Sequence, residues 1–139
     1  MSWTATLVTD DASARAWLGV PEALFAGQPG WRPRVEATAA VFDPARNPCF
    51  EDGVAARWVL RDAGGALAGR VAAFGRGPVP DAVGGIGFFA CVDAQEAAAA
   101  LLSTAEAWLR EQGFLGADAP INFGERDRFW GLRVHGSGP

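Results

Sequence analysis

The chain has 139 residues, half of them apolar, which is enough for one globular domain over residues 1–132 followed by a disordered tail over residues 133–139. Its 12 basic residues are all Arg and are outnumbered by 16 acidic residues, so the net charge of -4 argues against nucleic-acid or anionic-membrane binding. The N-terminus lacks the charged start and apolar core of a signal peptide, and no run of 18 apolar residues occurs. We therefore expect a cytoplasmic protein with no membrane span.

The first predicted elements are a strand and a helix. Residues 3–8 alternate weakly between polar and apolar side chains, which favours a short strand. A turn or N-cap cluster at residues 9–11 precedes Ala12 to Phe25, where apolar residues recur at helical spacing. Gly19 and Pro21 are expected to break this helix into two pieces.

A second short helix is predicted over Val35 to Val41, after a loop rich in Pro and Gly. Two strands follow, from Ala55 to Leu60 and from Ala66 to Phe74. Because the residues between them, RDAGG, are typical of a tight turn, we predict an antiparallel hairpin.

The most specific pattern is a strand that leads directly into a helix. Ile86 to Val92 is an apolar run typical of a strand buried on both faces. Asp93 and Glu96 have the spacing of a capping box, an apolar helical face follows, and Gly113 is placed to end the helix. Leu115 to Ile121 is the next predicted strand, parallel to the first. The whole order predicts an α/β domain with a mixed sheet.

Two small motifs have structural explanations that we prefer. Gly85, Gly87 and Ala90 match G-x-G-x-x-A, but they open a strand and not a helix, so a bulge or close backbone approach is favoured over dinucleotide binding. Cys49 and Cys91 are too few and too far apart for a zinc site or a disulfide framework. Both are expected to be reduced structural thiols.

Few residues have the character of catalytic groups. His135 is the single histidine and lies in a Gly-rich tail, so neither a metal site nor a Ser-His-acid site is expected. Asp127 lies in a run of alternating charge that is typical of a solvated face, although a role as general base is the functional alternative. Trp17, Trp58 and Trp108 are predicted to be core residues.

Six segments together resemble the GCN5-related N-acetyltransferases, a family with an acyl-CoA N-acyltransferase fold. They are QPGWRPRV, FDPARNPCFE, LAGRVAAF, GIGFFACVDAQEAA, AEAWLREQG and APINFGERDRFWGL, and they cover most of the chain from Trp17 to Leu132. More narrowly, the chain resembles the N-terminal half of a longer bacterial acetyltransferase-like protein, incomplete at its C-terminus.

This resemblance implies acetyl-CoA as the donor and an unknown small-molecule or peptide amine as the acceptor. The pantetheine arm would lie along the strand and the pyrophosphate on the amides that open the following helix. The implied catalytic base is Asp127, and the implied cofactor-binding residues are Phe89, Ala90, Cys91, Val92, Ala94, Gln95, Ala97, Ala98 and Asn122.

The sequence departs from the family pattern in two respects. The pyrophosphate loop Q/R-x-x-G-x-G/A is absent, since VDAQEAA has no glycine, and the chain has no Tyr to act as general acid. Two hypotheses therefore remain, an acetyltransferase and a non-catalytic module that keeps the fold. An incomplete sheet would also expose the strand from Leu115 to Ile121 as an edge, which predicts self-association as a homodimer.

Overall fold

The computed structural model describes residues 2–32, 34–76, 83–121 and 123. Their elements are β1 (Thr4–Leu7), α1 (Asp11–Phe25), α2 (Val35–Val41), the short 3-10 helix η1 (Pro48–Glu51), β2 (Gly53–Arg61), β3 (Leu67–Arg76), β4 (Val83–Cys91), α3 (Gln95–Glu111) and β5 (Gly116–Asp118). Apart from η1, this is the predicted order of strands and helices, and α2 has the predicted bounds.

The strands form one five-stranded sheet in the order β1-β2-β3-β4-β5. Neighbours are antiparallel except for β4 and β5, which run parallel and are joined through α3, as predicted. In the predicted hairpin β2–β3, Asp62 Oδ1 accepts hydrogen bonds from the amides of Gly64 and Ala66 at 2.9 and 3.0 Å. β5 is shorter than predicted, although the Ile121 amide still donates to the Ile86 carbonyl at 3.2 Å.

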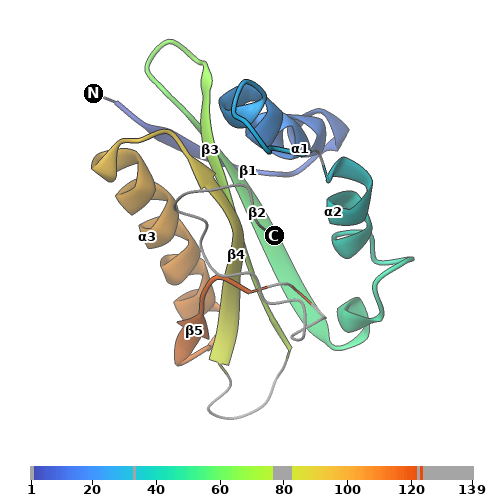
Figure 1. The fold of residues 1–139 in the computed structure, drawn as a ribbon. Helices are drawn as coiled ribbons and strands as arrows, with labels where there is room; N and C mark the ends of the chain where they lie inside the picture. The colour runs from blue at the N-terminus through green and yellow to red at the C-terminus, as the bar shows by residue number, and fades with distance from the viewer. Residues whose placement is uncertain (1, 33, 77–82, 122, 124–139) are drawn as a thin grey trace.

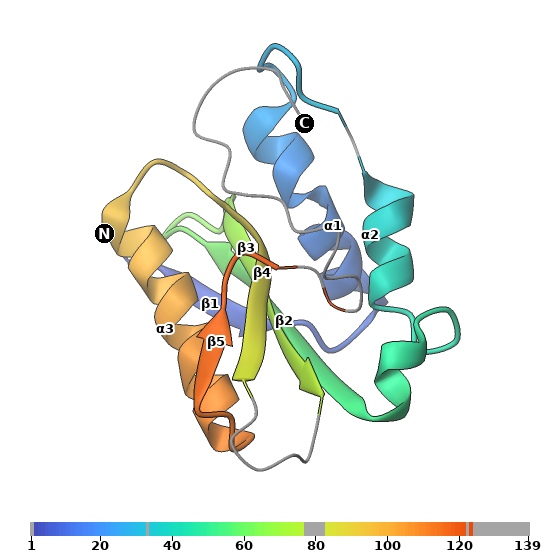
Figure 2. The same ribbon diagram turned by 60° about the horizontal axis from the view of Figure 1, so that its bottom comes forward.

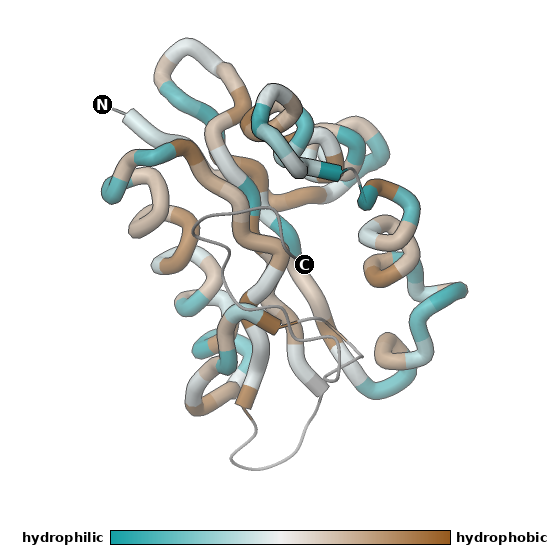
Figure 3. Tube along the Cα trace, in the orientation of Figure 1, coloured by the Kyte–Doolittle hydropathy of each residue, from teal (hydrophilic) through white to brown (hydrophobic). Residues whose placement is uncertain are grey.

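The helices cover both faces of the sheet, with α3 on one face and α1 and α2 on the other (Figures 1 and 2). Apolar residues therefore gather along the strands in the middle of the molecule (Figure 3). The core under α3 includes Trp58, Leu60, Val71, Leu101 and Leu109, and the core under α1 includes Trp17, Val20, Val59, Phe74 and Phe123. The predicted core positions of Trp17 and Trp58 are confirmed.

Helix α1 is continuous, so the predicted break at Gly19 and Pro21 is wrong. Proline has no amide hydrogen to donate to the carbonyl four residues earlier, which here belongs to Trp17. That carbonyl instead accepts a hydrogen bond from Arg70 Nη1 at 3.3 Å. A side chain from β3 therefore supplies the donor that Pro21 lacks, and the helix continues to Phe25.

The end of α3 is as predicted. Gly113 adopts a φ of 92°, in the left-handed region that glycine tolerates. Its amide donates to Arg110 O and the Phe114 amide donates to Leu109 O, both at 3.0 Å, which is the Schellman pattern. Leu109 and Phe114 pack in the same core, so the turn also fixes where the chain re-enters the sheet.

Both cysteines are free thiols, as expected.

Gly85, Gly87 and Ala90 lie within β4 and do not open a helix, which agrees with the prediction that this motif belongs to a strand. None of the described helices combines the length and the apolar character needed to cross a membrane.

Candidate functional site

Strand β4 carries a bulge at its middle. Arg70 on β3 pairs with Ala90 on β4, and Ala72 pairs with Gly87. Between these two pairs the chain advances by two residues on β3 but by three on β4, so β4 contains one extra residue. The extra residue falls next to Phe88, which has a φ of 56°, a conformation that is rare for a bulky side chain. The bulge turns Phe88 toward the α1 face, whereas Ile86 faces α3.

Arg70 holds this bulge. Its Nε donates to the Phe88 carbonyl at 3.0 Å, while its Nη1 donates to the Trp17 carbonyl on α1. Burial lowers the pKa of Arg70 to about 10, so the side chain stays cationic at neutral pH. The Arg70 guanidinium group thus hydrogen-bonds both to Phe88, the residue of β4 with a positive φ, and to helix α1.

Beyond the bulge, one edge of β4 is covered by no other described strand, and we call this its open edge. Among the described residues, β5 pairs with β4 from Val83 to Gly85, and one further bond on that side joins Ile121 to Ile86. A Cβ on Gly87 would collide with the Ile121 carbonyl, so the chain leaving β5 crosses directly over Gly87. Within the described part of the chain, Ala90 and Cys91 of β4 then pair with β3 alone. The backbone N–H and C=O groups on this edge of β4 could form hydrogen bonds with an extended ligand.

The N-terminus of α3 follows this open edge after a connection of residues 92–94. Here the predicted capping box is wrong, because the N-cap is Ala94 and no side chain caps the helix. The Ala94 amide donates to Val92 O at 2.7 Å, which forms a tight turn and moves the helix start one residue past the predicted position. The first helical bond joins Ala98 N to Ala94 O. The amides of residues 95–97 precede it and have no partner within the helix, so an anion would be stabilised at this end of α3.

The structure brings most of the predicted cofactor-binding residues together at this junction. Phe89, Cys91, Val92 and Ala94 are partly buried against the core under α3, Ala90 lies in the opposite core, and Gln95 is exposed. Ala97 is fully buried and Ala98 partly so. Ala90 and Ala97 could therefore meet a ligand only through their backbone. Asn122 and Asp127 lie outside the described residues, as does His135.

The side chains at the junction offer little reactive chemistry. Burial raises the pKa of the Cys91 thiol, which disfavours a nucleophilic thiolate. Among the described residues, no group of three or more His, Cys, Asp or Glu side chains could hold a metal ion. What the junction presents to a ligand is mainly backbone amides.

Sequence reasoning missed Arg57 and Arg70, which both lie on the face of the sheet under α1. The available signal was a charged residue at an inward position of an apolar strand, in ARWVL and AGRVAAF. That signal marks an unusual residue but does not identify its contacts, because Trp17 and Phe88 are distant from Arg70 in the sequence.

Comparison with known proteins agrees with this architecture. An aminoglycoside acetyltransferase from an uncultured soil metagenomic sample superposes with a TM-score of 0.58 at 14% identity, covering 88% of this chain and 81% of its own. AAC(6')-Iy, in complex with the bisubstrate analogue CoA-S-monomethyl-acetylneamine, gives 0.58 at 14% identity over 97% and 99% of the two chains.

A GCN5-related N-acetyltransferase from Ralstonia eutropha JMP134 gives a TM-score of 0.54 at 20% identity over 99% of this chain and 98% of its own. No protein-family model matches the sequence, and no curated protein sequence matches it either. At these identities the similarity is one of fold. The mixed sheet, the bulged β4 and the following helix α3 thus belong to a chain that has the GCN5-related N-acetyltransferase fold.

Proposed function

We propose that this protein binds acetyl-CoA and transfers the acetyl group to an amine. The observation that carries the proposal is the continuous path from the open edge of β4 to the uncapped N-terminus of α3. An extended pantetheine arm can bond to a free strand edge, and a pyrophosphate is stabilised by helix-opening amides. A structural neighbour of the same fold holds a CoA bisubstrate analogue, which supports this use of the fold.

In the proposed reaction the amine nitrogen attacks the thioester carbonyl carbon, the C–S bond breaks, and CoA leaves as its thiolate, which then takes up a proton. The nitrogen loses one proton to Asp127 or to water. A backbone amide near the bulge at Phe88 would polarise the carbonyl oxygen as negative charge develops on it. These roles are proposals, as are the predicted cofactor contacts of Phe89, Ala90, Cys91, Val92, Ala94, Gln95, Ala97, Ala98 and Asn122.

Two acidic side chains are expected to weaken cofactor binding. Asp93 and Glu96 are exposed beside the amides that open α3, and neither caps the helix. Their carboxylates would repel the pyrophosphate across a short distance, and salt would screen that repulsion. We therefore expect weak binding of acetyl-CoA by the natural sequence.

The test is a calorimetric titration with acetyl-CoA at low and high salt. The double variant Asp93→Asn and Glu96→Gln should bind on the order of tenfold tighter at low salt, with a smaller gain at high salt. The control is Glu106→Gln with Glu111→Gln, which makes the same charge change farther along α3 and should leave the affinity nearly unchanged. Equal affinities of both double variants and the natural chain would place the cofactor elsewhere.

A non-catalytic module with the same fold is the alternative, and the same titration separates the two, since only the acetyltransferase requires acetyl-CoA to bind. We also propose a cytoplasmic location, which the two free thiols support because reducing compartments preserve them. Self-association through the β5 edge belongs to the proposal as well.

A further inference from the structure

Two arginine side chains lie on the face of the sheet that α1 covers. Arg57 on β2 pairs with Ala72, and Arg70 on β3 pairs with Ala90. The Arg57 guanidinium carbon is 5.3 Å from the centre of the Trp17 ring and 4.9 Å from that of Phe42. The Arg70 guanidinium carbon is 4.4 Å from the centre of the same Trp17 ring. We call Arg57, Arg70 and their aromatic neighbours Trp17, Phe42 and Phe88 the arginine–aromatic cluster.

The positive charge of this cluster has no acidic partner in the described part of the chain. Burial lowers the pKa of both arginines, and no carboxylate of the described residues contributes to that shift. Arg70 donates to two neutral backbone carbonyls, which leave its charge uncompensated. Acidic residues outnumber arginines in the sequence, so opposite charge is not scarce. Two cations near one ring also repel each other, which cation–π contacts offset only in part.

The cluster adjoins the proposed transfer site on the side away from α3. Arg70 bonds to the carbonyl of Phe88, and the Phe88 ring lies 5.1 Å from the ring of Phe42, centre to centre. Arg57, Arg70 and Phe88 are each partly exposed. With α3 and its amides on the opposite face, an acceptor would approach the bulge from the α1 side and meet this cluster.

We infer that the acceptor is an amine that also carries a carboxylate, as an amino acid does, and that Arg57 and Arg70 bind the carboxylate. This inference rests on the proposed acetyl transfer at the β4 bulge. A carboxylate between the two guanidinium groups would compensate both charges, and the rings of Phe42 and Phe88 would contact an apolar side chain. A polycationic aminoglycoside would meet like charge here. The substrate preference should therefore differ from that named for the aminoglycoside acetyltransferase of similar fold.

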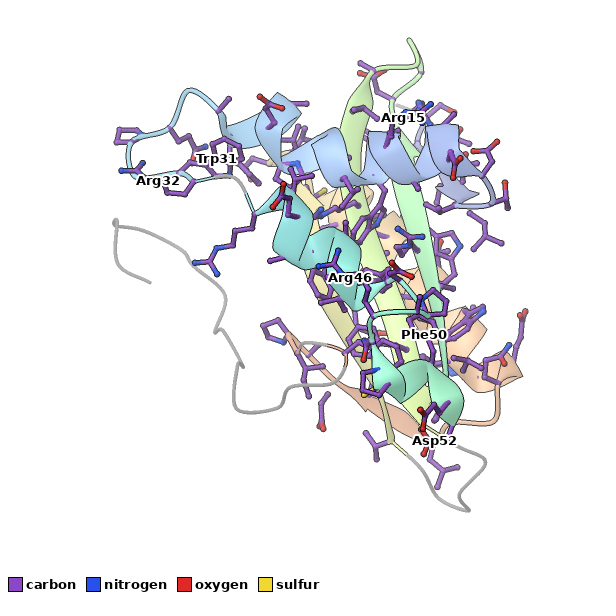
Figure 4. All side chains as sticks on the ribbon, turned by 90° about the vertical axis from the view of Figure 1, so that its right-hand side faces the viewer. Arg15, Trp31, Arg32, Arg46, Phe50 and Asp52 are labelled. Carbon is purple, nitrogen blue, oxygen red and sulfur yellow. The ribbon has the colours of Figure 1, made fainter. Side chains whose placement is uncertain are left out.

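The test compares two product analogues by calorimetric titration of the full chain, N-acetyl-L-phenylalanine and N-acetyl-L-phenylalaninamide. Both have a neutral, acetylated nitrogen, and they differ only in the carboxylate of the first and the amide of the second. The carboxylate probe should bind at least about tenfold tighter than the amide. Arg57→Gln should remove most of that preference, so that the two probes bind with similar affinity. Arg15→Gln is the matched control, because it makes the same charge change at an exposed position of α1 (Figure 4).

A second variant, Arg57→Lys, keeps the positive charge and should retain part of the preference for the carboxylate probe. It therefore distinguishes loss of the charge from a folding defect in Arg57→Gln. Thermal unfolding of each variant reports that defect directly. Equal binding of the two probes, no saturable binding of the carboxylate, or a preference that survives Arg57→Gln would overturn the inference. The acetyl-CoA titration tests the proposed acetyl transfer independently of the carboxylate site. If the protein prefers the carboxylate probe but does not bind acetyl-CoA, the proposed transfer is refuted and the carboxylate site is retained.

Discussion

Asp10 and Asp93 both precede an apolar helix, yet only Asp10 caps one. Asp10 Oδ1 accepts hydrogen bonds from the amide and the hydroxyl of Ser13, both at 2.7 Å, and the Ser13 hydroxyl in turn accepts from the Asp10 amide at 3.1 Å. This reciprocal pattern is a capping box with serine at the third helical position. At α3, the turn from Val92 to Ala94 displaces Asp93 from the capping position. Spacing alone could not distinguish the two cases.

The first prediction concerns these two carboxylates. Asp10→Ala should lower the melting temperature by a few degrees, because the first turn of α1 loses a bonded acceptor. Asp93→Ala is the matched control and should leave the melting temperature nearly unchanged, since Asp93 caps no helix. Differential scanning calorimetry measures both, and an equal loss from the two substitutions would contradict the assigned helix start.

The effect of Asp10 should also depend on pH. Hydrogen bonds from the Ser13 amide and then the Ser13 hydroxyl hold the pKa of Asp10 below its ordinary value. A carboxyl with a depressed pKa in the folded state stabilises the fold above its unfolded pKa. That contribution is lost as the pH falls through the folded pKa. The difference in melting temperature between the natural chain and Asp10→Ala should therefore persist at neutral pH and shrink in acid.

At the scale of the elements, local patterns predicted the order of strands and helices and the bounds of α2. Helix α2, the hairpin β2–β3 and the end of α3 follow from apolar spacing, turn residues and a glycine, which are all local signals. The bulge at Phe88 and the continuity of α1 depend instead on Arg70, whose partners are distant in the sequence. The junction of β4 and α3 was therefore predicted, but the arginine that holds its bulge was not, and cofactor binding at this junction stays a prediction.

Two glycines in helical contexts should respond in opposite directions to alanine. Gly113→Ala should destabilise the fold by about 1 kcal/mol, because the φ of 92° is strained for any residue with a Cβ. Gly19→Ala should stabilise it by about 0.4–1 kcal/mol, because alanine favours the helix. An added Cβ meets nothing within 4 Å at either position, so backbone conformation alone decides the sign. Urea unfolding of both variants checks this, and a shift in the same direction for both would contradict it.

At the scale of the whole molecule, the sheet formed by the described residues ends at β1 on one side and at β5 on the other. All four residues of β1 pair with β2, and all three residues of β5 pair with β4. The three residues of β5 are exposed. Leu115, which precedes β5, is 72% exposed, and Leu7 at the end of β1 is 44% exposed. Apolar side chains at an open edge favour strand pairing between molecules.

Of the two edges, we expect β5 to mediate self-association. Sedimentation velocity over a range of concentrations should show a dimer that weakens on dilution. Leu115→Glu should shift the protein to monomer, because a charge at the edge opposes pairing. Leu7→Glu is the matched control, since it places the same charge at the opposite edge and should leave the dimer intact. If Leu7→Glu dissociates the dimer instead, association uses β1. A monomer at every concentration would show that the β5 edge does not pair at all.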